Sequence, residues 1–337
     1  MPIVSDVTVL GTGTAVGGSK PDSITYANGD IWVEYGNGAN STGGSGFSTI
    51  VEYDRNGDVD TTFHVAGSVD GLKYDKFTHR IWALQNQDGN STLTIIDPIT
   101  GAMTGPLDYA HTSHLRGFDD VIFTRHTVYL SYTNPVGAPD PVLVVLKEGN
   151  HPHGLLHIIS PILRDGADGT NTETGKIGHV PLNDPDSIKQ APNGDFIFTS
   201  GGDNTIVDIH NPGTTFQTVS FTKVNGVPPG APNGTLDDVI KPDAHSGTFY
   251  VAAGSANDVI SFHGSHLNLH DYYVSIGDFF GQVNPHTGHF TALVSAPGAH
   301  GAIFVADRHS VPDTSGLHHS EVHAAGLHGD HDGLLFA

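Results

Sequence analysis

The sequence predicts an all-β protein, a six-bladed β-propeller that its N-terminal strand closes. Three observations support this: a short acidic motif recurs along the chain, a strand-like run follows most copies, and 43 glycines and 20 prolines separate the runs. A repeat period near 50 residues is typical of propellers, in which each blade is one small antiparallel sheet. A closed array is a single domain, which we place at residues 1–310, followed by a His/Gly-rich tail at 311–337.

The recurring motif is an acidic residue, then a small or acidic residue, then a branched apolar residue. Its copies begin at Asp22, Asp70, Asp119, Asp186 and Asp237, with an altered sixth copy at His300. Successive copies begin 48 to 67 residues apart, and the two longest spacings are expected to hold insertions at 149–178 and 258–277. We expect the six copies to be the innermost strands of six blades.

Apolar and aromatic runs follow the first five copies and are expected to pair with them as second strands. These runs are 30–33, 80–83, 127–130, 195–198 and 248–251. No clear second strand follows the sixth copy. Residues 3–10 alternate like a strand and precede the first copy, so we expect them to complete the last blade and remove its exposed edge.

The charge balance argues against two classes of partner. The chain has 36 acidic and 14 basic residues, a formal net charge of −22. Nucleic acids and anionic membranes attract clustered Lys and Arg, so neither is an expected partner. No stretch approaches the ~20 apolar residues that a membrane-spanning helix needs, so no membrane insertion is predicted. The sequence gives no indication of oligomeric state.

The chain contains no cysteine, which excludes disulfides, thiolate nucleophiles and Cys-ligated zinc. The first residues lack the basic and apolar regions of a classical signal peptide. The last six residues, 332–337, resemble the uncleaved C-terminal signal of bacterial type I secretion substrates. We therefore predict an extracellular protein, with a cytoplasmic location as the alternative.

The first residue of each motif copy is a candidate metal ligand, because the innermost strands of a propeller line its channel. The ring would comprise Asp22, Asp70, Asp119, Asp186, Asp237 and His300. Two like charges about 4 Å apart repel by about 1 kcal/mol in water and several-fold more at a protein-like dielectric. Either some carboxylates are protonated or a divalent cation lies among them. Oxygen ligands favour Ca²⁺, our first expectation, or Mg²⁺, while the imidazole would also suit a transition metal.

A structural interpretation of the same residues stays open. An aspartate at the start of an inner strand can accept hydrogen bonds from backbone N–H groups of the neighbouring loop and so fasten one blade to the next. The two interpretations are compatible if only some of the acids turn inward.

The histidine-rich tail is a possible secondary metal site. Its candidate ligands are His319, His323, His328 and His331. His319 and His323 are four residues apart, a spacing that would place them on one face of a helix. Neither known catalytic motif is complete, because Ser320 stands where a zincin needs Glu, and Gly326 stands where a metallo-hydrolase motif needs His. A plain solvated tail is the alternative.

Three segments resemble a known family. They are Pro21-Asp-Ser-Ile with Asn28-Gly-Asp-Ile-Trp-Val33, its echo Pro185-Asp-Ser-Ile with Asn193-Gly-Asp-Phe-Ile-Phe198, and Gly298-Ala-His-Gly-Ala-Ile-Phe-Val305. Together they resemble six-bladed propellers of the NHL and SMP-30/gluconolactonase-like group over nearly the whole chain. That group includes Ca²⁺-dependent lactonases and phosphotriesterases, and also non-catalytic binding propellers.

The resemblance leaves two functions open. The first is a divalent-metal-dependent hydrolase of the lactonase type, which acts on a small molecule through the acidic ring. The second is a non-catalytic propeller that binds a small-molecule, glycan or protein ligand through its inserted loops. The lactonase-type site combines Glu, Asn and Asp ligands, whereas the repeated position here holds only Asp and His.

Overall fold

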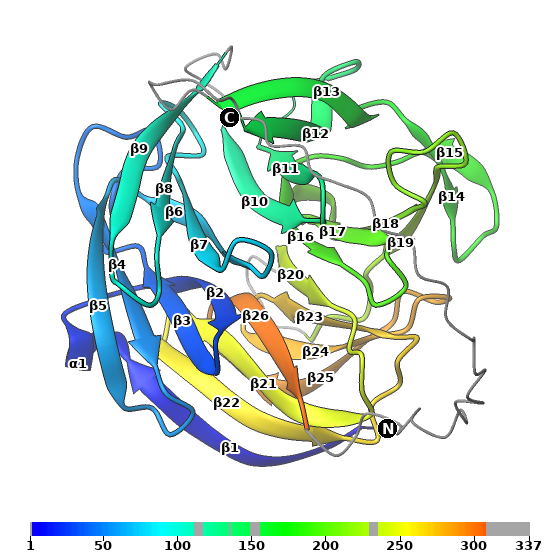
Figure 1. Ribbon diagram of the computed structural model, residues 1–337. Helices are drawn as coiled ribbons and strands as arrows, with labels where there is room; N and C mark the ends of the chain where they lie inside the picture. Colours follow the sequence, from blue (N-terminus) through cyan, green and yellow to red (C-terminus); the bar gives the residue numbers. More distant parts are fainter. Residues whose placement is uncertain are drawn as a thin grey trace, which may run out of the picture.

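The protein is a six-bladed β-propeller whose blades surround a central channel (Figure 1). The computed structural model describes residues 2–110, 117–133, 135, 137–148, 156–228 and 235–307. Within these ranges the helical segments are a single turn, α1 (Gly13–Val16), and the 3₁₀ turn Gly201–Asp203. None of the described helices is long and apolar enough to cross a membrane. The predicted fold class is confirmed.

The first three blades follow the chain in simple order. Blade 1 comprises β2 (Pro21–Ala27), β3 (Asp30–Tyr35), β4 (Phe47–Tyr53) and β5 (Val59–Ala66). Blade 2 comprises β6 (Val69–Asp75), β7 (Arg80–Gln85), β8 (Thr92–Ile96) and β9 (Met103–Ala110). Blade 3 comprises β10 (Phe118–Phe123), β11 (Val128–Tyr132), β12 (Pro141–Glu148) and β13 (Leu156–Arg164). A short parallel pairing of β9 with β13 joins the outer edges of blades 2 and 3.

Blade 4 contains six strands because part of the expected insertion extends it. Its regular strands are β16 (Pro185–Gln190), β17 (Phe196–Ser200), β18 (Thr205–His210) and β19 (Thr218–Lys223). The short strands β14 (Asp168–Asn171) and β15 (Ile177–His179) lie beyond β19, with β14 parallel to it. The segment 149–178 is therefore not a separate insertion in blade 3: it supplies the last strand of blade 3 and the outer edge of blade 4.

Blades 5 and 6 exchange strands, which corrects two expectations. Blade 5 contains β20 (Leu236–Ile240), β23 (Tyr272–Ile276), β24 (Phe279–Val283) and β25 (Phe290–Ser295). Blade 6 contains β26 (Ala299–Ala306), β21 (Ser246–Ala253), β22 (Asp258–Ser265) and β1 (Ile3–Thr12). The run 248–251 was wrongly assigned as the second strand of blade 5, because it lies in β21 and pairs with β26. Likewise, the expected insertion 258–277 is two regular strands.

The N-terminal strand closes the ring as predicted. β1 is the outermost strand of blade 6 and pairs antiparallel with β22. The innermost strand of the same blade, β26, comes from the other end of the described chain (Figure 1). Blade 6 is therefore assembled from three separate parts of the sequence, so it can form only when the ring closes.

Each motif copy forms a β-bulge on the innermost strand of a blade. In blade 1, Asp22 and Ser23 of β2 together lie opposite the single residue Glu34 of β3. The same one-residue excess occurs at the other five copies. An extra residue interrupts the strict alternation of a strand and turns a side chain in a new direction. The bulges are therefore the local reason that a polar residue can face the channel while its neighbours stay packed.

The third residue of the motif anchors each inner strand in the core between blades. These residues are Ile24, Leu72, Val121, Ile188, Val239 and Ala302, and none exceeds 3% exposure. Burying a side chain of this kind stabilises the fold by about 1.5–3 kcal/mol, except for the smaller alanine. The apolar position of the motif therefore fixes the strand, and the polar positions are left to the channel.

Candidate functional site

The six predicted ring residues converge. All of them line one cavity of about 150 Å³ on the channel, each contributed by a different blade. The cavity lining includes Asp22, Asp70, Asp119, Asp186, Asp237 and His300. Ligand atoms of Asp22, Asp237 and His300 lie within 4.8 Å of one another, close enough to share one ion. The sequence thus correctly predicted which side chains meet, while their role as metal ligands stays a prediction.

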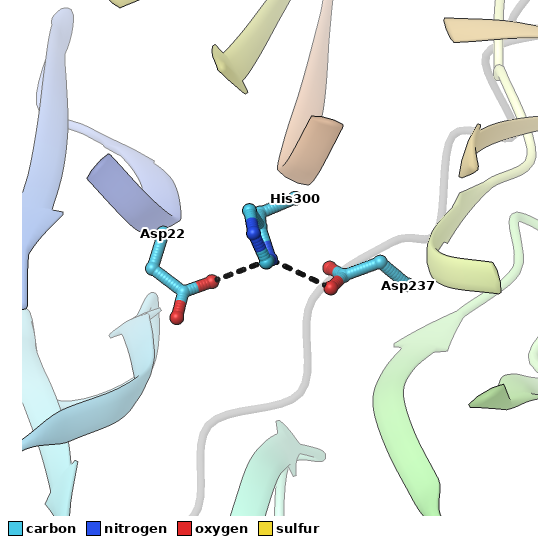
Figure 2. A group of neighbouring side chains, drawn as sticks. All are labelled: Asp22, Asp237 and His300. Atoms are coloured by element: carbon cyan, nitrogen blue, oxygen red, sulfur yellow. Dashed lines mark hydrogen bonds and ion pairs between the residues drawn. The ribbon is translucent and has the colours of Figure 1, made fainter. Parts of the chain in front are cut away.

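His300 lies between two carboxylates (Figure 2). Its Nδ1 is 2.8 Å from Asp237 Oδ2 and 3.4 Å from Asp22 Oδ1. The negative charges of Asp237 and Asp22 raise the pKa of His300 to about 10, although burial opposes the shift. At neutral pH the imidazole is therefore a cation, and its Nδ1–H donates a hydrogen bond to Asp237 Oδ2.

The carboxyl groups of Asp22, Asp70, Asp119 and Asp186 resist ionisation. Burial raises the pKa of Asp22 to about 6; His300 opposes this shift and Asp237 adds to it. Burial first, and then the surrounding carboxylates, raise the pKa values of Asp70, Asp119 and Asp186 well above the usual range. This is the behaviour expected of like charges held together without a sufficient counter-charge.

Hydrogen bonds satisfy the remaining ring acids only in part. Asp70 accepts a hydrogen bond of 3.0 Å from the Gln87 side chain. Asp119 Oδ2 is buried without a hydrogen-bond partner among the described residues. No backbone N–H of the described chain donates to any of the five ring carboxylates. A buried acceptor that lacks a donor is costly, so these oxygens are available to a ligand.

The structural role belongs instead to the next residue of the motif. Asp120 accepts from Lys73 Nζ at 2.8 Å and from the Ile188 N–H of the following blade at 3.1 Å. Asp238 accepts from Lys189 Nζ at 2.6 Å. Although burial opposes it, the Lys189 and Lys73 ammonium groups hold the pKa of Asp238 below its usual value.

Two further contacts complete this fastening of blade to blade. Asp238 accepts from the Ala302 N–H of blade 6 at 2.5 Å, and Ser23 accepts from the Leu72 N–H of blade 2 at 2.8 Å. Motif aspartates do accept backbone N–H groups of the next blade, as the structural interpretation expected. The acceptors are the second residues of the motif, Asp120 and Asp238, and not the first. Position one faces the cavity, whereas the Asp and Ser residues at position two line the same cavity and also bind the neighbouring blade.

The cavity carries a large excess of negative groups. Seven aspartates line it, the five of the ring together with Asp120 and Asp238. Three basic side chains, Lys73, Lys189 and His300, line the same cavity, which leaves four acidic groups without a cationic counterpart. Mutual repulsion of this size favours proton uptake or the binding of one or two divalent cations.

Lys73, Lys189 and Glu34 also belong to the site or adjoin it, and none of them was predicted from the sequence. Lys73 and Lys189 follow their ring aspartates by three residues, and this Asp-x-x-Lys spacing in copies two and four was a detectable signal. Copies three and five contain two adjacent aspartates instead, and the second aspartate of each pair forms an ion pair with one of these lysines. Glu34 lies among apolar residues near the end of β3, fully buried opposite the Asp22 bulge. Burial, and then Asp22, raise the pKa of Glu34 well above its usual value.

The secondary metal candidates cannot be placed. His319, His323, His328 and His331 lie outside the described residues. Their predicted role therefore stays a prediction from the sequence.

Comparison with known proteins identifies the fold. No model of a known protein family and no curated protein matches the chain. A solved structure provisionally described as a gluconolactonase is 14% identical, covering 87% of this chain and 82% of its own, with a TM-score of 0.51. Virginiamycin B lyase from Staphylococcus aureus is 11% identical, covering 91% and 94%, with a TM-score of 0.52.

A third similar structure is the periplasmic gluconolactonase of Pseudomonas aeruginosa, 12% identical over 85% of this chain and 88% of its own, with a TM-score of 0.48. The chain is a six-bladed propeller, similar in fold to the structure described as a gluconolactonase and to virginiamycin B lyase. The structural match establishes the shared fold. Identities this low leave the activity open, because one propeller fold supports many chemistries.

Proposed function

We propose that the ring binds a divalent cation, with Ca²⁺ the first candidate, and that the protein is a metal-dependent hydrolase of a small lactone-like ester. The observation that carries the proposal is the convergence of seven carboxylates and only three basic groups on one cavity of about 150 Å³. Hard oxygen donors in excess are the ligand set that Ca²⁺ prefers.

The residues present fit such an ion. Asp70, Asp119 and Asp186 come from three successive blades, and all three are without an ion pair to a described lysine or arginine. Asp119 Oδ2 is an orphaned buried acceptor, which a cation would satisfy. When bound, a divalent cation polarises a carbonyl oxygen and lowers the pKa of a water molecule.

His300 and Asp237 are the candidate proton-transfer pair of this chain. Asp237 fixes the ring orientation by accepting from Nδ1, which leaves Nε2 to exchange a proton with substrate or water. A positive charge among the carboxylates would weaken the field that keeps His300 protonated, and would bring its pKa closer to neutrality.

The size of the cavity limits what can enter it. Pockets for drug-sized ligands usually span roughly 300–1,000 Å³. A cavity of about 150 Å³ accommodates an ion with the reacting end of a small molecule, while the remainder of the substrate lies outside it.

A non-catalytic binding propeller is the second candidate, and one observation favours it. His300 is held as a cation between Asp22 and Asp237, with a pKa raised to about 10. A permanently protonated imidazole cannot act as a general base at neutral pH. In this case the ring would bind a cation or a cationic ligand without turnover.

The test combines metal binding with hydrolysis. Calcium binding is measured by calorimetry, and hydrolysis of a panel of small lactones is measured with calcium and with chelator. The hydrolase proposal expects calcium-dependent turnover that both Asp186→Asn and His300→Gln abolish. Calcium binding without turnover on the panel supports the binding propeller. Absence of binding by any divalent cation contradicts the cation site itself.

Export from a bacterial cell is a separate proposal, and it rests on sequence alone. Its supports are the acidic, cysteine-free composition and the apolar residues 334–337. Deleting these four residues should abolish export in the native host, and unchanged export would contradict the idea.

A further inference from the structure

The two ends of the channel carry opposite charge. Neighbouring inner strands run in the same direction, since the N–H groups of Leu72 and Tyr74 on β6 donate to Ser23 and Thr25 on β2 in matching order. The acidic ring lies at the second residue of β6, β16 and β20. Residues that follow these strands therefore lie at the other end, roughly 13–20 Å away at the usual strand rise of about 3.3 Å per residue.

Lysines gather at that other end. Lys76 directly follows β6, and Lys241 directly follows β20. Lys76 and Lys241 line one cavity of about 580 Å³ together with Lys189. An adjoining cavity of about 230 Å³ shares Lys76 and Lys189 and adds Lys73. We call these two adjoining cavities, with their four lysines, the basic mouth.

The ammonium groups of the basic mouth are not all neutralised. Lys73 and Lys189 are paired with Asp120 and Asp238 in the channel. Lys76 and Lys241, by contrast, form no ion pair within 4.0 Å of a carboxylate of the described residues, and the charge of Lys241 acts on Asp208 only at longer range. Their Nζ atoms each lie 5.3 Å from the centre of an aromatic ring, Phe77 for Lys76 and Tyr272 for Lys241. Such contacts orient a cation without neutralising its charge.

The remaining lining is mixed in character. The larger cavity has one acidic residue, Asp243, and the smaller one has none. Ile240, Ile303 and Phe304 supply an apolar wall to the larger cavity, and Gln190 supplies an amide. A few positioned polar groups beside an apolar wall are typical of a small-molecule site.

We propose that the basic mouth is a second ligand site, which binds a small organic anion combining a carboxylate or phosphate group with an apolar body. The chain has a net charge of −22, so its overall field repels anions. A pocket that gathers four of its 14 basic residues is therefore a local exception to that field. Lys76 and Lys241 bind the anionic group, and the apolar wall packs against the body.

The site is distinct from the carboxylate ring, although the two share a wall. Lys189 lines both the acidic cavity and the basic mouth, and its ammonium group is held by Asp238 and by the Ala302 carbonyl oxygen at 2.9 Å. The buried lysine–aspartate pairs thus separate the acidic half of the channel from the basic half.

Binding is tested with benzoate and phenyl phosphate as anionic probes and benzyl alcohol as the neutral control. The protein is first freed of divalent ions by chelation and dialysis, so that no probe binds through a cation on the ring. Ligand-observed NMR and calorimetry should show both anions, or one of them, binding to the wild type, and benzyl alcohol binding at least tenfold more weakly. The relative strength of the two anions identifies the preferred head group.

Matched variants locate the binding. The double variant Lys76→Gln/Lys241→Gln should bind the anions at least tenfold more weakly, or about 1.4 kcal/mol. Lys76→Arg/Lys241→Arg should retain binding, and Lys176→Gln, at a turn of blade 4, should match the wild type. Circular dichroism confirms that each variant is folded. Absence of anion binding, equal binding of benzyl alcohol, or unchanged binding by the double glutamine variant would each overturn the proposal, whether or not the ring binds calcium.

Discussion

Asp237 and Asp238 are adjacent in the chain, but their side chains bind different partners and have different roles. Asp237 faces the cavity and accepts from His300, whereas Asp238 accepts from Lys189 and from the backbone of the next blade. The β-bulge in β20 makes this possible, since both residues lie opposite one residue of β23. The pair shows how one short motif supplies both a potential ligand and the fastening of the ring.

Substitutions at the two motif positions should therefore have opposite effects on stability. Asp238→Asn leaves the buried Lys189 without its charged partner and should cost about 3–5 kcal/mol. Asp186→Asn removes one of the mutually repelling ring charges, so the metal-free protein should melt at the same or a higher temperature. Thermal melts in chelator compare the two variants. Equal destabilisation by both would contradict the division of roles.

Removal of metal should lower stability. A cation that binds only the folded state stabilises it by RT ln(1 + [L]/Kd), about 2.7 kcal/mol at a hundredfold excess over Kd. We expect calcium to raise the melting temperature of the wild type and chelator to reverse the effect. Asp186→Asn should show a smaller calcium-induced rise. Identical wild-type melts with calcium, magnesium and chelator would argue against any cation on the ring.

The metal-free protein should become more stable on mild acidification. The Asp22 carboxyl has a pKa of about 6 in the fold against an ordinary value of 3.8, so the folded state takes up a proton before the unfolded state does. Asp70, Asp119 and Asp186 shift in the same direction. The free energy of unfolding should therefore rise as pH falls through about 6 toward 4.

Denaturant titrations in chelator, at several pH values from about 8 to 5, check this pH dependence. Asp186→Asn serves as the control, because it has one ring carboxyl fewer and should show a weaker dependence. A stability that declines steadily over this acidification would show that other groups dominate.

His300 should titrate at unusually high pH. Asp237 and Asp22 raise its pKa to about 10, so the metal-free protein should hold the imidazolium through neutral pH. NMR of the ring C–H signals, assigned by comparison with His300→Gln, follows the protonation directly. Asp237→Asn removes one of the two carboxylates beside the imidazole, so the pKa of His300 should be lower in this variant than in the wild type. A midpoint near that of an ordinary histidine in the wild type would refute the arrangement.

Loss of the N-terminal strand should open the ring. Leu10 of β1 packs with Tyr53 and Val259, so it belongs to the core shared by blades 6 and 1. Deleting residues 1–12 should lower the melting temperature and expose the edge of β22, which favours association between molecules. Melting curves and light scattering measure both effects. The control is Ile3→Ser, at a side chain that is 56% exposed. This substitution should change neither the melting temperature nor the association state measured by light scattering.

Much of this fold could be predicted from local pattern. In the first four copies a strand, a tight turn and a second strand can be recognised within about 15 residues, and the six copies of the acidic motif define six blades. The exchange between blades 5 and 6 could not be predicted in this way. Runs 248–251 and 272–276 are both apolar and β-prone, and only packing across the whole ring decides which of them pairs with β20.

The repeat pattern alone identifies the six residues that meet on the channel, because a repeated residue in a closed array must recur around the axis. The tertiary structure decided what each of them contacts. Lys73 and Lys189 come from blades 2 and 4 and meet Asp120 and Asp238 of blades 3 and 5. Such partners are about 50 residues apart in the chain, and their pairing depends on the stagger between neighbouring blades, which no local pattern encodes.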